Sequence, residues 1–178
     1  MGRDKQGNIY SILIRYSILV VLAVSSFRLF YVIFTPLTIY PVFFLLKIFY
    51  NVSLSGTLIF FDHSFIQLVD ACIAGSAYYL LIVLNLTTPM PVKKIVPSLL
   101  FTLLAFLFIN VFRIFLFSIL FFVSSPLFSI FHLIFWYALS AVFVFAVWFA
   151  NTKLFNIKEI PVYSDFKFLY SSIVRNKS

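Results

Sequence analysis

Long apolar runs are the feature that most constrains what this chain can fold into. Ile12 to Phe34 and Ile95 to Val123 both exceed the roughly 20 residues that an α-helix needs to cross the hydrocarbon core of a bilayer. Of the 178 residues, 63% are hydrophobic and 10% are charged, too few polar side chains to cover a water-facing surface. The sequence therefore predicts an all-α, polytopic membrane protein.

Two further runs, Cys72 to Leu86 and Leu127 to Ala150, complete the predicted bundle. Pro36 is expected to break the first helix, and Leu37 to Tyr50, which follows it, could be a tilted span or a re-entrant segment. The prediction is one domain over residues 1–178, with four to five transmembrane helices. The amino terminus lies outside with five helices and inside with four.

The basic residues predict how the bundle is oriented. The net charge of the chain, +8, first suggests binding to nucleic acid, but the basic residues lie between the apolar runs or in the tail, residues 151–178. Under the positive-inside rule, the tail and the loop with Lys93 and Lys94 are cytoplasmic. We therefore expect a protein of the plasma membrane, in contact with lipids and not with nucleic acid. The run that begins at Cys72 starts at the outer face.

The stretch from Asn51 to Asp70 differs from the rest because it is more polar. Val52 to Ser55 alternates in polarity, and Gly56 separates it from the apolar residues Leu58 to Phe61. This pattern predicts a short strand-and-turn element outside the membrane core, which leads directly into Cys72. With the three runs that follow, it forms a predicted core over residues 51–150, which holds the residues considered next.

Three separated residues are expected near the outer leaflet. Cys72 begins its run, and His132 lies about 9 Å below the outer end of the last run, at 1.5 Å per residue. Arg113 lies about 15 Å from the end of its run, but its long side chain can reach outward. An arginine within an apolar run needs a partner or a watery cavity. Cys72, Arg113 and His132 could therefore meet.

These residue types fit thiol chemistry. A thiol needs a base or a cationic neighbour to become a thiolate, which makes His132 the natural base for Cys72. Arg113 could hold a substrate carboxylate or stabilise an oxyanion. Asn110, three residues earlier on the same helical face, and Asp70 could orient these groups. A single cysteine forms no disulfide within the chain and no zinc site, and we expect neither metal nor cofactor.

At these residues the sequence resembles the exosortase and archaeosortase family, whose members process C-terminal sorting signals of exported proteins. The matching segments are Val69-Asp70-Ala71-Cys72 with nearby Gly75, Asn110-Val111-Phe112-Arg113-Ile114, and Phe131-His132. They follow the family's order of Cys, Asn-x-x-Arg and His, and the resemblance covers roughly residues 51–150. Cys72-Ile73-Ala74-Gly75 departs from the Cys-Ser-Gly of many bacterial members. The chain is also smaller than typical bacterial exosortases, so it looks more like the compact archaeal branch.

The resemblance implies a transpeptidase or protease that recognises a tail made of a short motif, a transmembrane helix and a basic end. Cys72 would attack near the motif, and the acyl group would pass to an amine, a lipid or water. His132 would serve as base and acid, and Arg113 would stabilise substrate or oxyanion.

Structural roles remain open for the same residues. Cys72 could be a small packing residue, His132 an interfacial hydrogen-bonding residue, and Arg113 and Asp70 a structural salt bridge. The alternative function is therefore a non-enzymatic membrane assembly or transport subunit. A metalloprotease is disfavoured because the sequence lacks His-Glu-x-x-His.

Overall fold

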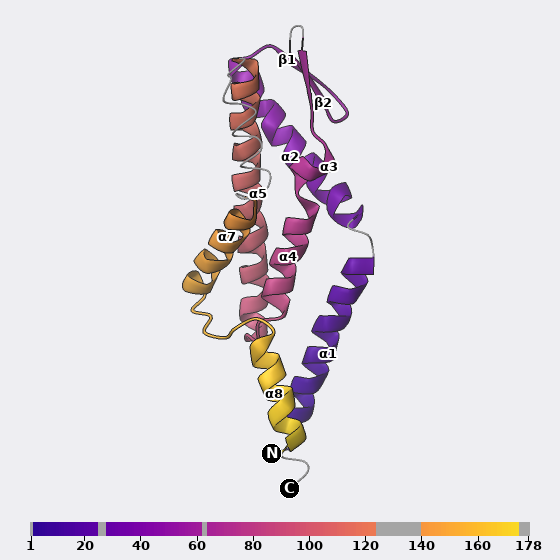
Figure 1. Ribbon diagram of the computed structural model, residues 1–178, viewed down its shortest axis with the longest axis vertical. Coiled ribbons are helices and arrows are strands. Elements are labelled where there is room, and N and C mark those ends of the chain that lie inside the picture. The colour runs from indigo at the N-terminus through magenta and orange to yellow at the C-terminus, as the bar shows by residue number, and fades with distance from the viewer. Residues whose placement is uncertain (1, 25–27, 62–63, 124–139, 175–178) are drawn as a thin grey trace.

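The computed structural model describes residues 2–24, 28–61, 64–123 and 140–174 of the chain (Figure 1). The helices and strands, in order, are α1 (Gly2–Val24), α2 (Arg28–Phe49), β1 (Val52–Ser55), β2 (Leu58–Phe61), β3 (Ser64–Gln67), α3 (Asp70–Ile73), α4 (Gly75–Leu86), α5 (Val92–Phe122), α7 (Ser140–Leu154) and α8 (Tyr163–Val174). The prediction of a mostly helical chain with a small strand element is confirmed.

Helix α5 is the axis of the molecule. It runs along the long dimension, and α2, α4 and α7 pack against it (Figure 1). The small sheet lies at one end of this dimension, whereas α8 and the beginning of α1 lie at the other. The molecule is therefore elongated along α5.

Within the described ranges, two helices are long and apolar enough to cross a membrane. They are α2 and the Lys93–Phe122 part of α5. Three apolar stretches are shorter, Tyr10–Val24, Asp70–Leu86 and Ala141–Leu154. Two helices of this length and composition agree with the predicted membrane association, and a bundle of four to five spans remains a prediction.

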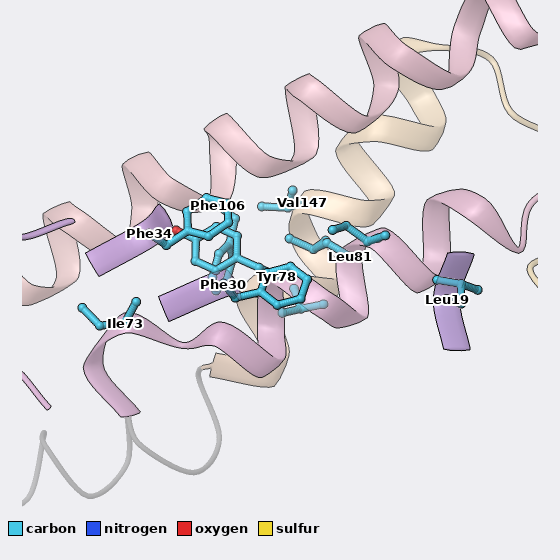
Figure 2. Close-up of a cluster of buried hydrophobic side chains, with 10 residues drawn as sticks. Leu19, Phe30, Phe34, Ile73, Tyr78, Leu81, Phe106 and Val147 are labelled. Atoms are coloured by element: carbon cyan, nitrogen blue, oxygen red, sulfur yellow. The ribbon is translucent and has the colours of Figure 1, made fainter. Parts of the chain in front are cut away.

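The main core lies where the helices cross. Phe34 of α2 stacks on Tyr78 of α4 with ring centroids 3.6 Å apart, and Phe106 of α5 meets Tyr78 edge-on at 5.0 Å. Figure 2 shows these rings together with Leu81 and Val147. Offset and edge-to-face contacts are the favoured geometries for aromatic pairs. The many phenylalanines therefore serve in part as packing between helices.

The amino-terminal region differs from the prediction in two ways. The run from Ile12 to Phe34 is divided between α1, which ends at Val24, and α2, which begins at Arg28. Pro36 does not break a helix, since it lies inside α2 with Pro41. Proline removes one backbone donor, which an apolar helix tolerates when neighbouring helices pack around it. Residues 37–49 therefore continue a 22-residue helix and form no separate segment.

The strand-and-turn element is confirmed and is larger than predicted. Strands β1 and β2 form an antiparallel hairpin within this element, with Ser55 opposite Leu58. Gly56 has a φ of +61°, which suits the first central position of a two-residue hairpin turn. The third strand, β3, was not predicted, and it pairs antiparallel with β2.

A buried cluster of polar side chains joins α4, α5 and α7, and it was also missed. Ser98 Oγ lies 2.6 Å from Asn85 Oδ1 and 3.0 Å from Asn151 Oδ1, and Asn151 Nδ2 donates to Ser98 Oγ at 2.8 Å. Asn85 Nδ2 donates to Thr102 Oγ1 at 3.1 Å. All four side chains are fully buried. Such hydrogen bonds hold apolar helices together.

The remaining differences lie in the second half of the chain. Lys93 and Lys94 begin α5 instead of lying in a loop. The tail contains a helix, α8, which contacts α1 through an ion pair of 2.9 Å between Arg15 and Asp165. Residues 124–126 and the first part of the predicted run from Leu127 lie outside the described residues.

Candidate functional site

Cys72 lies on a short helical turn between the sheet and α4. Its helix, α3, ends at Ile73, and the next residue, Ala74, is left-handed, with a φ of 59° and a ψ of 44°. A non-glycine residue costs about 1–2 kcal/mol in this conformation. The predicted helix that starts at Cys72 is therefore two helices, because Ala74 redirects the chain between Cys72 and α4.

Two side chains of α5 approach the main chain of Cys72. Asn110 Nδ2 donates a hydrogen bond to the Cys72 carbonyl oxygen at 3.0 Å, and Arg113 Nη2 lies 3.5 Å from the same oxygen. Residues three apart on a helix share a face, which is why both reach one acceptor. Asn110 is buried, and Arg113 is partly buried. The structure thus brings together three of the predicted site residues.

A pocket of about 460 Å³ opens beside Cys72. It falls within the range of about 300–1,000 Å³ that is typical of ligand sites. Its walls come from α2, β3, α3, α4 and α5. Cys72, Arg113 and Asp70 all line it, with aromatic walls from Tyr31, Phe65, Phe117 and Phe121. A partly exposed thiol and a cationic side chain therefore face a common apolar cavity.

Asp70 is an exposed residue at the start of α3 and lines the same pocket. Among the described residues, Arg15 and Asp165 form an ion pair within 4.0 Å. Arg113 and Asp70 do not. The predicted salt bridge is thus not formed in this arrangement, although both charges border one cavity.

His132, the predicted base, lies in residues 124–139, outside the described residues. The described part of the chain holds no group of three His, Cys, Asp or Glu side chains that could bind a metal ion. The site is therefore characterised by Cys72, Asn110, Arg113 and Asp70.

Tyr31, which lines the pocket, packs closely against Gly75. This contact was not predicted from the sequence. A Cβ added to Gly75 would lie 3.0 Å from Tyr31 Cζ and 3.1 Å from Cε1. Such distances are shorter than ordinary van der Waals contact. Gly75 therefore lets the Tyr31 ring lie against the start of α4. The only sequence signal was a glycine close to the cysteine.

Comparisons with protein-family models, curated proteins and solved structures gave no match for this chain. Its function is therefore argued from the geometry and chemistry of the site.

Proposed function

We propose that this chain is a membrane-embedded cysteine transpeptidase or protease that cleaves the C-terminal tails of exported, membrane-anchored proteins. The observation that carries the proposal is that Cys72 and Arg113, 41 residues apart, line one apolar pocket and approach each other at the Cys72 carbonyl. A substrate bound in this pocket would contact both side chains. The resemblance to exosortases adds the class of substrate.

The proposed reaction begins when the Cys72 thiolate attacks the carbonyl carbon of the scissile amide. The oxygen of this carbonyl becomes an oxyanion, which Arg113 stabilises electrostatically. The C–N bond then breaks, the amine leaves with a proton from His132, and a thioester remains on Cys72. His132 then takes the proton of an amine, a lipid hydroxyl or water, which attacks the thioester and releases the thiolate.

In the proposed orientation, the site faces the extracytoplasmic side of the plasma membrane. Lys93 and Lys94, in the first turn of α5, lie beside the start of the basic tail, since Lys94 Nζ donates to the carbonyl oxygen of Phe155 at 2.8 Å. Helix α8 of this tail lies at the end of the molecule away from the sheet (Figure 1). Cytoplasmic placement of this basic end follows from the positive-inside rule. It would leave the sheet and the pocket at the outer face.

A non-enzymatic assembly or transport subunit is the second candidate. It is favoured by Arg113 and Asp70, because two opposite charges border one cavity in an apolar chain. Intramembrane ionisable groups of this kind also mark ion pathways. This function requires the charges and not the thiol, so dependence on cysteine separates the two candidates.

The test is processing of a co-expressed reporter that ends in a short motif, an apolar helix and basic residues. Wild type is compared with Cys72→Ala, Arg113→Ala and His132→Ala at matched membrane levels. Loss of the cleaved product with Cys72→Ala and strong losses with the other two support the transpeptidase. Undiminished cleavage by Cys72→Ala would instead move the assembly or transport function ahead. Phe108→Ala, an exposed position on α5 that does not line the pocket, is the control.

A further inference from the structure

Strand β3 borders the pocket that holds Cys72. The strand order β1-β2-β3 places β3 at an edge of the sheet, within the part of the chain that the structure describes. Four consecutive residues, Phe65 to Leu68, line the pocket. The chain then continues through Val69 into α3, which carries Cys72. The edge strand and the cysteine are therefore parts of one cavity wall.

The hydrogen-bonding pattern shows which backbone groups of β3 point outward. The N–H of Leu68 donates to the carbonyl of Thr57 at 3.0 Å, so Leu68 turns toward the β2 side. In an antiparallel pair, the residues that bond across to the partner strand alternate. Ile66, opposite Ile59, therefore also turns toward β2. Phe65 and Gln67 turn their N–H and C=O groups away from β2, along the outer edge.

We propose that an extended peptide segment of the substrate pairs with the outer edge of β3 and so presents its scissile bond to Cys72. This inference rests on the proposed function. Addition of a strand to a sheet edge gives affinity through main-chain hydrogen bonds, and pockets for alternate side chains give specificity. The occupant is an extended peptide because the outward groups are peptide N–H and C=O groups, for which another backbone is the complement.

The pocket walls indicate the side chain that the segment carries at its reacting end. Tyr31, Phe65, Phe117 and Phe121 make the walls aromatic, with Arg113 on the α5 side. An apolar or aromatic side chain fits such walls. Proline is excluded at the paired positions of the substrate that must donate, because it has no N–H.

The opposite edge of the sheet is less suited to this role. Strand β1 packs against α2, and none of its residues lines the pocket. It therefore supplies a matched control within the same sheet. Ile59 of β2 bonds toward β3, so its neighbours Leu58 and Phe60 bond toward β1, where they pair with Ser55 and Ser53. Because the bonded residues of β1 alternate, the N–H of Val52 points away from β2.

The first experiment replaces one outward N–H on each edge and follows cleavage of the reporter described above. Proline is tolerated on an edge strand where its missing N–H faces away from the ladder. We expect Gln67→Pro to slow cleavage about tenfold, because one main-chain hydrogen bond to the substrate is lost and the adjacent one is disturbed. Val52→Pro, the matched control, should stay within about threefold of wild type, as expected for a site that contacts no substrate.

The outcomes separate the two proposals. If Gln67→Pro cleaves as fast as Val52→Pro while Cys72→Ala is inactive, edge pairing is overturned and the transpeptidase stands. If Cys72→Ala cleaves as well as wild type, the proposed function fails, and the inference fails with it.

A second measurement holds even if Gln67→Pro does not fold. Cys72 is the single cysteine of the chain, so Cys72→Ala is a thiol-free background that also cannot turn over the substrate. Into it we introduce Gln67→Cys or Ile66→Cys, and disulfide cross-links are mapped to a reporter tail carrying one cysteine at each position in turn. Phe44→Cys, at an exposed position on α2, gives the background level of cross-links that form by random collision.

Edge pairing predicts cross-links at every second tail position with Gln67→Cys, because side chains of paired strands alternate between faces. Ile66→Cys should react at the intervening positions. Cross-links without this alternation, or none above the Phe44→Cys background from a tail that wild type cleaves, would overturn the inference.

Discussion

At the scale of single residues, the site is organised around the main-chain carbonyl of Cys72. Asn110 donates to it at 3.0 Å and Arg113 approaches it at 3.5 Å. This explains why an amide and a guanidinium stand three residues apart on α5. Sequence spacing predicted that these residues could meet, but not that the shared atom is a backbone oxygen. Asn110 therefore ties the main chain of Cys72 to α5.

Asn110→Ala is expected to weaken the positioning of Cys72. The Cys72 carbonyl would lose its shorter hydrogen bond, and displacement of a reacting group by about 1 Å can slow a reaction about a hundredfold. The measurements are reporter cleavage and the rate at which a maleimide labels Cys72, the single thiol. Slower cleavage together with a changed labelling rate indicates a displaced Cys72. If neither rate changes, the hydrogen bond has no positioning role.

Gly75→Ala should push the Tyr31 ring away from the start of α4. The added Cβ would lie 3.0 Å from Tyr31 Cζ, and overpacking of this kind costs about 1–3 kcal/mol. Thermal unfolding in detergent should show a lower midpoint. The double variant Tyr31→Ala/Gly75→Ala should be closer in stability to Tyr31→Ala alone, since the clash is removed. An additive loss in the double variant would contradict the contact.

At the scale of elements, α4, α5 and α7 are connected by polar groups inside an otherwise apolar interface. Asn85, Ser98 and Asn151 come from three helices and are separated by up to 66 residues. No local pattern marks them, because each is a single polar residue within an apolar run. Only the packing of the three helices shows that they meet.

Asn85→Ala is expected to destabilise this helix interface. Ser98, Thr102 and Asn151 would each lose a partner while staying buried, and an unsatisfied buried group costs about 1–3 kcal/mol. The measurement is a double-mutant cycle of Asn85→Ala and Asn151→Ala by unfolding in detergent. The cycle should show coupling of the two losses, about 0.5 kcal/mol or more for groups in one network. Independent, additive losses would argue against a shared network.

At the scale of the whole molecule, the first and last helices that the structure describes, α1 and α8, are in contact far from the sheet (Figure 1). Arg15 of α1 binds Asp165 of α8 at 2.9 Å and also donates to the Leu86 carbonyl at 2.9 Å. Their side chains are only 12% and 5% exposed. A buried pair of this kind fixes α8 against α1 and the end of α4. The basic tail is therefore a structural part of the molecule and more than a topology signal.

Asp165→Ala should release α8 from α1. Removal of one partner from a buried pair costs about 3–5 kcal/mol because the other charge stays behind. Trypsin should then cut sooner at Lys158 and Lys167 in membranes or detergent. The exposed substitution Tyr170→Ala on the same helix is the control. Equal cutting of both variants would show that the ion pair does not hold α8.

The sequence by itself determined the helical class, the apolar helices, the strand-and-turn element after residue 51 and the candidate residues Cys72, Asn110 and Arg113. These follow from hydropathy, turn chemistry and helical spacing, which are local properties of the chain. The tertiary structure decided that α1 and α2 are separate, that Pro36 lies within a helix and that a third strand borders the pocket. These features depend on neighbouring helices that satisfy backbone and side-chain groups from outside the segment. It also decided which atom of Cys72 the α5 side chains reach, because that depends on how α3 packs against α5.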